Sequence, residues 1–278
     1  MKTKKKLKVK WKNLFILTVI LISFITLIIS SINIIKWLID SSNTKDEVKK
    51  IEEIVKVEEV KDNENTKIIE QPTDPPKENP YWDYIKMNMI NVNFNDLKIK
   101  NNDVKRWIQV NGTNINYPFV QTTNNDYYLN HSFNKNKNNA GWIFIDYRNN
   151  INLLDQNTII YGHSRQDTTM FGSLKNILNN GWLDYSENHV IKLSTETENS
   201  LWQVFSVYHI PTTSDYLKIN FSTSEEFQTF ANTLINRSAH DFNTYISEND
   251  KILTLSTCYN NDTERVVLHA KLIKIEKK

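Results

Sequence analysis

The sequence predicts a mainly β domain, a closed or nearly closed barrel of short strands, preceded by one membrane-spanning helix. Three observations support this prediction. An uncharged stretch lies near the amino terminus, a polar segment with several prolines follows it, and short apolar runs separated by polar turns fill the rest of the chain. Many short strands with few helices are typical of barrels. With 278 residues and 39% hydrophobic residues, the chain has enough apolar material for one such domain plus appendages.

The amino-terminal segment has the length and composition of a membrane anchor. Residues 14–35 carry no charge, and at about 1.5 Å per residue a helix of this length crosses the roughly 30 Å hydrocarbon core of a bilayer. A cleaved signal peptide is the alternative, but the residues around Trp37 offer no small-residue cleavage site. Basic residues remain on the cytoplasmic side, and lysines precede the span at positions 2, 4, 5, 6, 8, 10 and 12. We therefore expect a cytoplasmic tail at 1–13, a single-pass anchor in the lipid bilayer at 14–38, and an extracytoplasmic remainder.

The remainder divides at Pro80. Residues 39–79 are rich in charged residues and end in a proline-containing run, which predicts a stalk with at most a marginal helix. Residues 80–278 form the expected folded domain. Helical patterns occur at 81–90, 170–178 and 224–235, the last with two glutamates in its first turn but without a full capping box. Strands are expected at 107–110, 142–145, 158–161, 190–193, 202–208, 252–255 and 266–270.

Composition excludes several classes of function. The net charge of +2 depends on the amino-terminal lysines, so no nucleic-acid-binding face is predicted. A single cysteine excludes an internal disulfide and any paired-cysteine zinc or redox site. The six histidines do not occur at metal-ligand spacing. The sequence therefore predicts neither a metal nor a cofactor.

Cys258 is the first candidate for chemistry, because it ends an apolar strand. Alternation places Thr254 and Ser256 on its face of that strand, an unusual lining for the inert buried cysteine that is the alternative interpretation. Arg265 begins the next strand, so a hairpin would bring its guanidinium near the thiol. A cation there favours the thiolate and can stabilise an oxyanion. By itself, however, Arg265 also fits a solvated residue at the rim.

His163 is the candidate base, because it follows a buried-type strand and Gly162, which permits close approach of backbone or substrate. His269 lies inside a predicted strand and is expected to be structural. Reference pKa values of about 8.5 for Cys and 6.5 for His can be drawn together by a cation and by desolvation. A thiolate can then attack a carbonyl while an imidazolium protonates the leaving amine. The order, His before Cys, is the reverse of that in papain.

Together these motifs resemble the sortases of Gram-positive cell walls, and further segments resemble class B of that family. The motifs around the candidate catalytic residues are Tyr161-Gly162-His163, 254–258 and 265–272. The segments that indicate class B are 117–121, 125–129, 141–148 and 170–172. The resemblance covers essentially the whole of residues 80–275.

The resemblance implies an eight-stranded barrel with amino-terminal helices and a helix in the long loop before the cysteine strand. It implies a cysteine transpeptidase with Cys258 as nucleophile, His163 as acid/base and Arg265 as charge stabiliser. The implied partners are surface proteins with a carboxyl-terminal sorting signal, cleaved after Thr through a thioester, and an accepting amine of a peptidoglycan precursor or cross-bridge. A thiol hydrolase and a non-catalytic wall-binding module remain alternatives. The implied substrate-binding residues are Asn125, Leu129, Thr212, Tyr216, Leu217 and Ser256.

Overall fold

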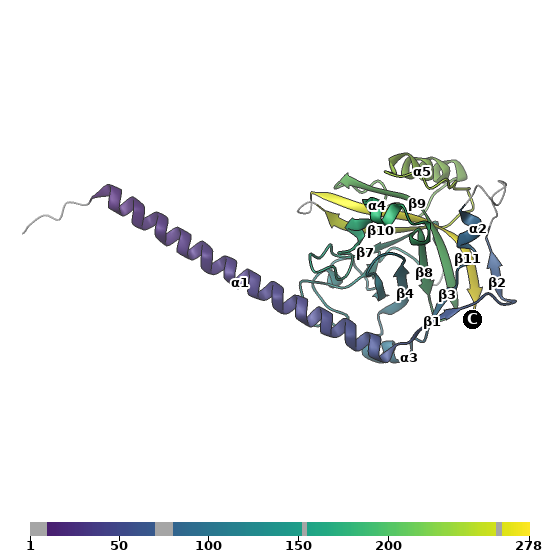
Figure 1. The fold of residues 1–278 in the computed structure, drawn as a ribbon, viewed down its shortest axis with the longest axis horizontal. Coiled ribbons are helices and arrows are strands. Elements are labelled where there is room, and N and C mark those ends of the chain that lie inside the picture. Colours follow the sequence, from purple (N-terminus) through teal and green to yellow (C-terminus); the bar gives the residue numbers. More distant parts are fainter. Residues whose placement is uncertain (1–9, 70–79, 152–154, 260–262) are drawn as a thin grey trace, which may run out of the picture. The chain divides into compact units, whose positions relative to one another are not determined.

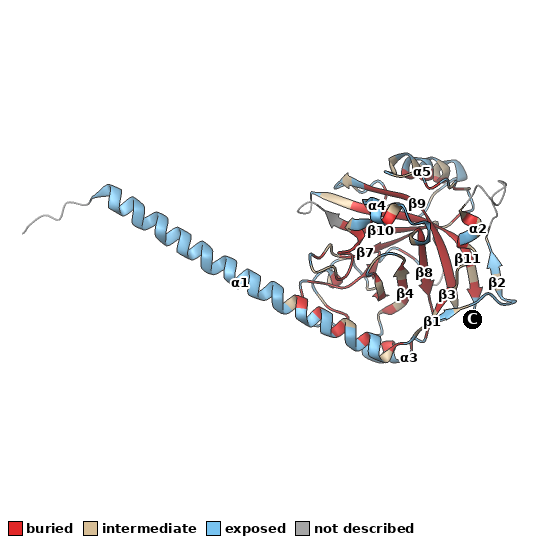
Figure 2. Ribbon diagram, viewed as in Figure 1, coloured by how far each residue is buried: buried red, intermediate tan, exposed pale blue. Residues whose placement is uncertain are grey.

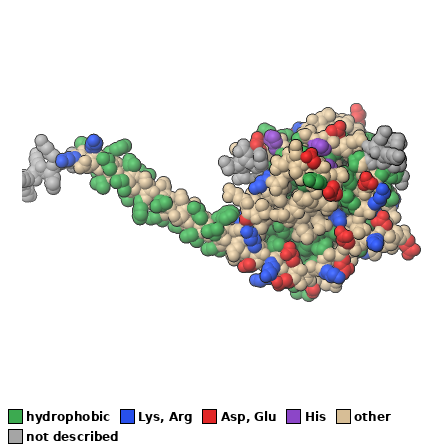
Figure 3. Space-filling view, viewed as in Figure 1, with side chains coloured by type: hydrophobic (Ala, Val, Ile, Leu, Met, Phe, Trp, Pro, Cys, Tyr) green, Lys and Arg blue, Asp and Glu red, His purple; other side chains and the backbone are tan. Residues whose placement is uncertain are grey.

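The computed structural model describes residues 10–69, 80–151, 155–259 and 263–278, with the side chains of Cys258 and Tyr259 outside this description. The chain divides into two compact units, Met1–Asn43 and Thr44–Lys278. The first unit contains the greater part of helix α1 (Trp11–Ile54). This helix carries a stretch long and apolar enough to cross a membrane. The apolar side chains of that stretch are exposed along its length (Figures 2 and 3), as expected of a surface that faces lipid.

The second unit is a closed β-barrel. Eight of the described strands form the ring, in the order β10-β7-β6-β5-β4-β8-β9-β11, and pairing of β10 with β11 closes it (Figure 1). The predicted eight-stranded barrel is therefore confirmed. The strands of the ring are β4 (Val104–Val110), β5 (Asn116–Val120), β6 (Phe144–Ile145), β7 (Asn157–Tyr161), β8 (Val190–Ser194), β9 (Glu198–Pro211), β10 (Ile252–Tyr259) and β11 (Glu264–Lys277).

Large apolar side chains fill the barrel, because alternate residues of each strand point inward. Leu253 and Leu255 of β10 belong to the main core together with Trp107, Trp142 and Trp202, all nearly or fully buried. Ile252, on the other face of β10, packs in a different cluster. The alternation predicted for residues 252–257 is thus the one observed.

Helix α5 (Ser224–Arg237) covers part of the outer surface and lies, as predicted, between β9 and β10. Phe227, Ala231 and Leu234 are buried in the cluster that includes Ile252. The helix begins at Ser224, as predicted, and Thr223 is its N-cap, which accepts a hydrogen bond from the Glu226 amide at 3.1 Å. The capping threonine, one residue before the helix begins, was not predicted.

The segment expected to be a stalk is partly folded into the second unit. Ile51 and Val55 belong to the barrel core. Strand β1 (Val57–Val60) pairs with β3 (Met89–Val92), and β2 (Thr66–Ile68) pairs with the end of β11. Lys274 Nζ of β11 donates to Asp62 Oδ1 at 2.7 Å. The polar composition of this segment gave no sign of its strands, because short edge strands expose most of their side chains and often carry charged residues. Residues 70–79 lie outside the described residues.

Two expected helices are shorter than predicted. Residues 81–90 divide into α2 (Tyr81–Tyr84) and β3, and residues 170–178 contain only the 3-10 helix η2 (Leu174–Leu178). Apolar residues at helical spacing are buried in both places, although neither segment forms the long helix that the spacing predicted. The remaining helices of the described chain are α3 (Asn95–Lys100), η1 (Tyr127–Leu129), α4 (Asn180–Leu183) and η3 (Ser186–Asn188).

Candidate active site

Strand register brings the three candidate catalytic residues to one end of the barrel. β7 and β10 are parallel neighbours whose last paired residues are Tyr161 and Ser256. His163 and Cys258 each lie two residues beyond that pair, so their backbones leave the same edge of the sheet. Across the antiparallel ladder of β10 and β11, Cys258 is paired with Arg265. The hairpin that the sequence predicted is therefore present at this position.

The imidazole of His163 is half-buried and held by a backbone carbonyl. Its Nε2 lies 2.7 Å from the Leu129 oxygen. Because a carbonyl only accepts hydrogen bonds, Nε2 carries the hydrogen, and in the neutral ring Nδ1 is free to take a proton. The ring also packs against Gly141, where an added Cβ would lie 2.9 Å from His163 Cδ2. The backbone carbonyl of His163 accepts from the Phe171 amide at 3.1 Å, so both ring and backbone are positioned.

Arg265 is half-buried at the start of β11. Its Nη1 donates to the Glu264 carbonyl at 2.9 Å, and the residue lines a cavity of about 570 Å³. Arg265, which pairs with Cys258 across the ladder, is thus tethered to the neighbouring backbone and borders this cavity.

The cavity brings together all six residues that the resemblance implied for substrate binding. They are Asn125, Leu129, Thr212, Tyr216, Leu217 and Ser256. Arg265 also lines the cavity, and the seven lining residues that remain were not predicted to bind substrate, although Tyr161 and Gly162 directly precede His163 in the sequence. These further residues are Asp126, Phe144, Tyr161, Gly162, Thr213, Ser214 and Thr257.

The cavity has an apolar lining supported by polar contacts behind it. Leu129, Phe144, Tyr161, Tyr216 and Leu217 supply apolar surface, which favours a peptide side chain over a small polar molecule. The Tyr216 hydroxyl and Ser256 Oγ are 3.0 Å apart, which links the segment after β9 to β10. This contact fixes the wall of the cavity next to the cysteine strand.

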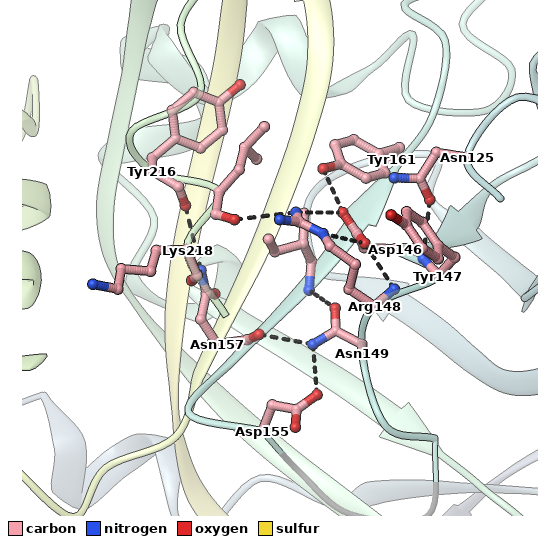
Figure 4. A network of polar contacts seen from close by, with 12 residues as sticks. Asn125, Asp146, Tyr147, Arg148, Asn149, Asp155, Asn157, Tyr161, Tyr216 and Lys218 are labelled. Atoms are coloured by element: carbon pink, nitrogen blue, oxygen red, sulfur yellow. Dashed lines mark hydrogen bonds and ion pairs between the residues drawn. The ribbon is translucent and has the colours of Figure 1, made fainter. Parts of the chain in front are cut away.

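A buried carboxylate lies behind Tyr161. Asp146 Oδ2 accepts from the Tyr161 hydroxyl at 2.9 Å and from Arg148 Nη2 at 2.8 Å, while Oδ1 accepts from Arg148 N and Nε at 2.9 Å (Figure 4). Burial favours the neutral carboxyl, but these hydrogen bonds outweigh it and lower the pKa of Asp146. Burial and the nearby carboxylate raise the pKa of Tyr161, which remains a neutral donor.

Two other histidines belong to the core. His269 is fully buried between Thr254 Oγ1 and the Tyr208 hydroxyl, each 2.8 Å from a ring nitrogen. Burial lowers its pKa to about 3. Its burial and its two hydrogen-bond partners fit the structural role expected of it. Burial likewise lowers the pKa of His189 to about 4. Both rings are neutral at physiological pH.

The arrangement suits acyl transfer through a cysteine. It combines a cysteine position at a strand end, an imidazole whose Nε2 is held by a carbonyl, a guanidinium and an apolar cavity for a peptide. Within the described part of the chain, no three or more His, Cys, Asp or Glu side chains gather in a way that could hold a metal ion.

Comparison with known proteins gives concordant results. Residues 108–273 match the family model described as "Sortase domain". The chain is 35% identical to sortase B of Staphylococcus aureus over 185 residues, which cover 66% of this chain and 75% of the relative. The structure of Clostridium perfringens sortase B matches with a TM-score of 0.61 and 36% identity, over 65% of this chain and 100% of that one. A Staphylococcus aureus sortase B-substrate complex matches with a TM-score of 0.61 and 35% identity, over 65% of this chain and 84% of the other.

Proposed function

This chain belongs to the sortase family of cysteine transpeptidases, to its class B, and on that premise we propose that it cleaves a carboxyl-terminal sorting signal after Thr and joins the released protein to a peptidoglycan amine. The observation that carries the proposal is the strand register. The register pairs Cys258 with Arg265. It also places Cys258 and His163 each two residues beyond the last pair of β7 and β10. The six residues implied for peptide binding line a cavity that Arg265 borders.

The first step is acylation. The Cys258 thiolate attacks the carbonyl carbon of the Thr residue, and the negative charge that develops on the carbonyl oxygen is stabilised by the Arg265 guanidinium. The new S–C bond is kept while the C–N bond of the peptide breaks. At the same time the imidazolium of His163 donates a proton to the leaving amine. The products are a thioester on Cys258 and a neutral His163.

The second step is transfer to an amine. The acceptor nitrogen attacks the thioester carbonyl and loses a proton to His163, and the S–C bond breaks to regenerate the thiolate. A new amide bond replaces the one that was cleaved, so the reaction needs no cofactor. A water molecule in place of the amine would yield a free acid, which is the outcome for a hydrolase.

The location that fits this reaction is the outer face of the cell membrane. We propose that α1 anchors the chain in the bilayer with its lysine-rich end in the cytoplasm. The domain that follows would then meet both the secreted protein that carries the sorting signal and the peptidoglycan precursor or cross-bridge that accepts it.

Product analysis tests the proposal. Full-length protein in detergent is incubated with a panel of x-Pro-x-Thr-x peptides, with and without triglycine or a diaminopimelate-containing peptide as the amine, and the products are separated by liquid chromatography and mass spectrometry. We expect an amine-ligated product that is lost in Cys258→Ala and reduced roughly 10²-fold or more in His163→Ala. Free acid alone, at the same rate with and without amine, would support a hydrolase. Turnover that persists in Cys258→Ala would refute the assigned nucleophile.

A further inference from the structure

Three consecutive residues after β6 each contact a different wall of the cavity. The Asp146 carboxylate accepts from the hydroxyl of Tyr161, at the end of β7. The Tyr147 amide donates to Asn125 Oδ1 at 3.0 Å. Arg148 Nη2 donates to the Leu217 carbonyl at 3.1 Å. Figure 4 shows Asn125 and Tyr161, from separate parts of the chain, beside these three consecutive residues. All three partners, Tyr161, Asn125 and Leu217, line the cavity.

The Asp146–Arg148 pair is held by several hydrogen bonds, although the Arg148 side chain is 46% exposed. The Asp146 side chain has 0% exposure, and each of its oxygens accepts two hydrogen bonds. Charge-assisted bonds of this two-pronged kind fix both distance and orientation. Gln121 Nε2 donates to the backbone carbonyls of Asp146 and Asn149, at 2.9 and 2.8 Å, so the backbone that carries the pair is held as well.

Arg148 also binds a wall of the cavity that has no regular secondary structure. The wall consists of residues 212–221, between β9 and α5. Asn157 Nδ2 donates to the carbonyls of Tyr216 and Lys218, at 3.3 and 2.9 Å. Arg148 donates to the carbonyl of Leu217, the residue between them. One guanidinium nitrogen thus serves both Asp146 and Leu217, a geometry that a lysine ammonium on its flexible stem does not reproduce.

We propose that Asp146 and Arg148 are positioning residues that set the spacing of the cavity walls and thereby the affinity for the peptide. Neither residue lines the cavity, so they act through Tyr161 and Leu217. This inference deepens the proposed function, because it takes a peptide to be the occupant of the cavity. It predicts an effect on peptide binding that is separate from the chemical step at Cys258.

The test compares Arg148→Gln and Arg148→Lys with Asp250→Asn in the full-length protein. Asp250→Asn controls for the loss of an ion pair elsewhere in the same unit, because Asp250 is a buried carboxylate, 2% exposed and paired with Lys271, that precedes β10 at the end away from Cys258. With a peptide that the wild type turns over, we expect Arg148→Gln to raise KM roughly five- to tenfold with kcat within about twofold. Arg148→Lys should give a smaller rise, and Asp250→Asn should leave KM unchanged even where it lowers the melting temperature.

A second measurement does not depend on turnover. Hydrogen–deuterium exchange of residues 212–221 should be faster in Arg148→Gln than in the wild type, and unchanged in Asp250→Asn. If the wild type processes no peptide, the proposed function fails while the exchange experiment still decides the positioning role. Unchanged exchange in a folded Arg148→Gln, an equal increase in Asp250→Asn, or a loss confined to kcat would overturn the inference.

Discussion

Gly141 offers a direct way to displace His163 without changing any group that takes part in the chemistry. Its φ of 61° lies in the left-handed region, which costs a residue with a side chain about 1–2 kcal/mol. A Cβ at this position would lie 2.5 Å from the Tyr128 carbonyl oxygen and 2.9 Å from both the Leu129 oxygen and His163 Cδ2. Ordinary contacts between such atoms are about 3.5 Å, so the neighbours must move.

The neighbours of Gly141 have different freedom to move. The Tyr128 carbonyl accepts the Trp142 amide at 2.9 Å, whereas His163 is a half-buried side chain in a loop. We therefore expect Gly141→Ala to displace the imidazole. Strain and repacking together should cost about 2–3 kcal/mol, or roughly 5–10 °C of melting temperature for a domain of this size. Because misplacement of a catalytic group by 1 Å costs on the order of 10²-fold, turnover should fall about 10- to 100-fold.

The matched control is Gly181→Ala. Gly181 lies in α4, and an added Cβ there meets nothing within 4 Å. Alanine is preferred over glycine in a helix by about 1 kcal/mol, so this variant should be as stable as the wild type or slightly more so, with unchanged turnover. The assay is peptide turnover at 25 °C together with thermal unfolding of each variant. Turnover of a folded Gly141→Ala within twofold of the wild type would refute the claim that this contact positions His163.

Three further predictions concern stability and charge. Because burial lowers the pKa of His269 to about 3, the unfolded chain binds more protons than the folded one below about pH 6.5, and the free energy of unfolding decreases as the pH falls. His269→Gln should reduce this decrease between pH 7.5 and pH 5 by about 2 kcal/mol, measured by urea titration. An identical decrease in both proteins would contradict the prediction. Thr223→Ala removes the N-cap of α5 and should cost about 1 kcal/mol in the same titration; no change would show that the cap is dispensable. Arg265→Lys should lower kcat/KM roughly tenfold or more, because an ammonium does not reproduce the guanidinium fork; a rate within twofold would exclude that role.

The barrel was predictable from sequence because its strands are apolar runs bounded by turns. The strand β5 was missed because Pro118 lies inside it, and proline is uncommon within strands. Its neighbour β6 pairs with it at Val120, and the Pro118 carbonyl accepts from Trp142 Nε1 at 2.8 Å. A side-chain hydrogen bond thus satisfies a backbone carbonyl that would otherwise pair with a neighbouring strand. No local sequence pattern indicates such a contact.

The site was predictable as far as it depends on strand ends. His163 follows β7, Cys258 lies near the end of the neighbouring β10, and Arg265 lies at the start of β11, so their placement at one end of the barrel follows from topology. The support behind the cavity was not predictable. Asp146 and Arg148 stand in a polar turn, where charged residues are usually solvated, and the Leu217 carbonyl that gives Arg148 its place is contributed by a segment remote in sequence.

The central claim is that Cys258 forms a covalent acyl intermediate, and intact-mass spectrometry tests it most directly. Full-length protein would be mixed with the x-Pro-x-Thr-x panel without an amine, quenched with acid, measured intact, and digested to locate the adduct. The account predicts a mass increase equal to that of the peptide fragment ending in Thr less one water, located on Cys258 and discharged by added amine. Product formation from a peptide in the panel with no adduct on Cys258, or with the adduct on another residue, would contradict it.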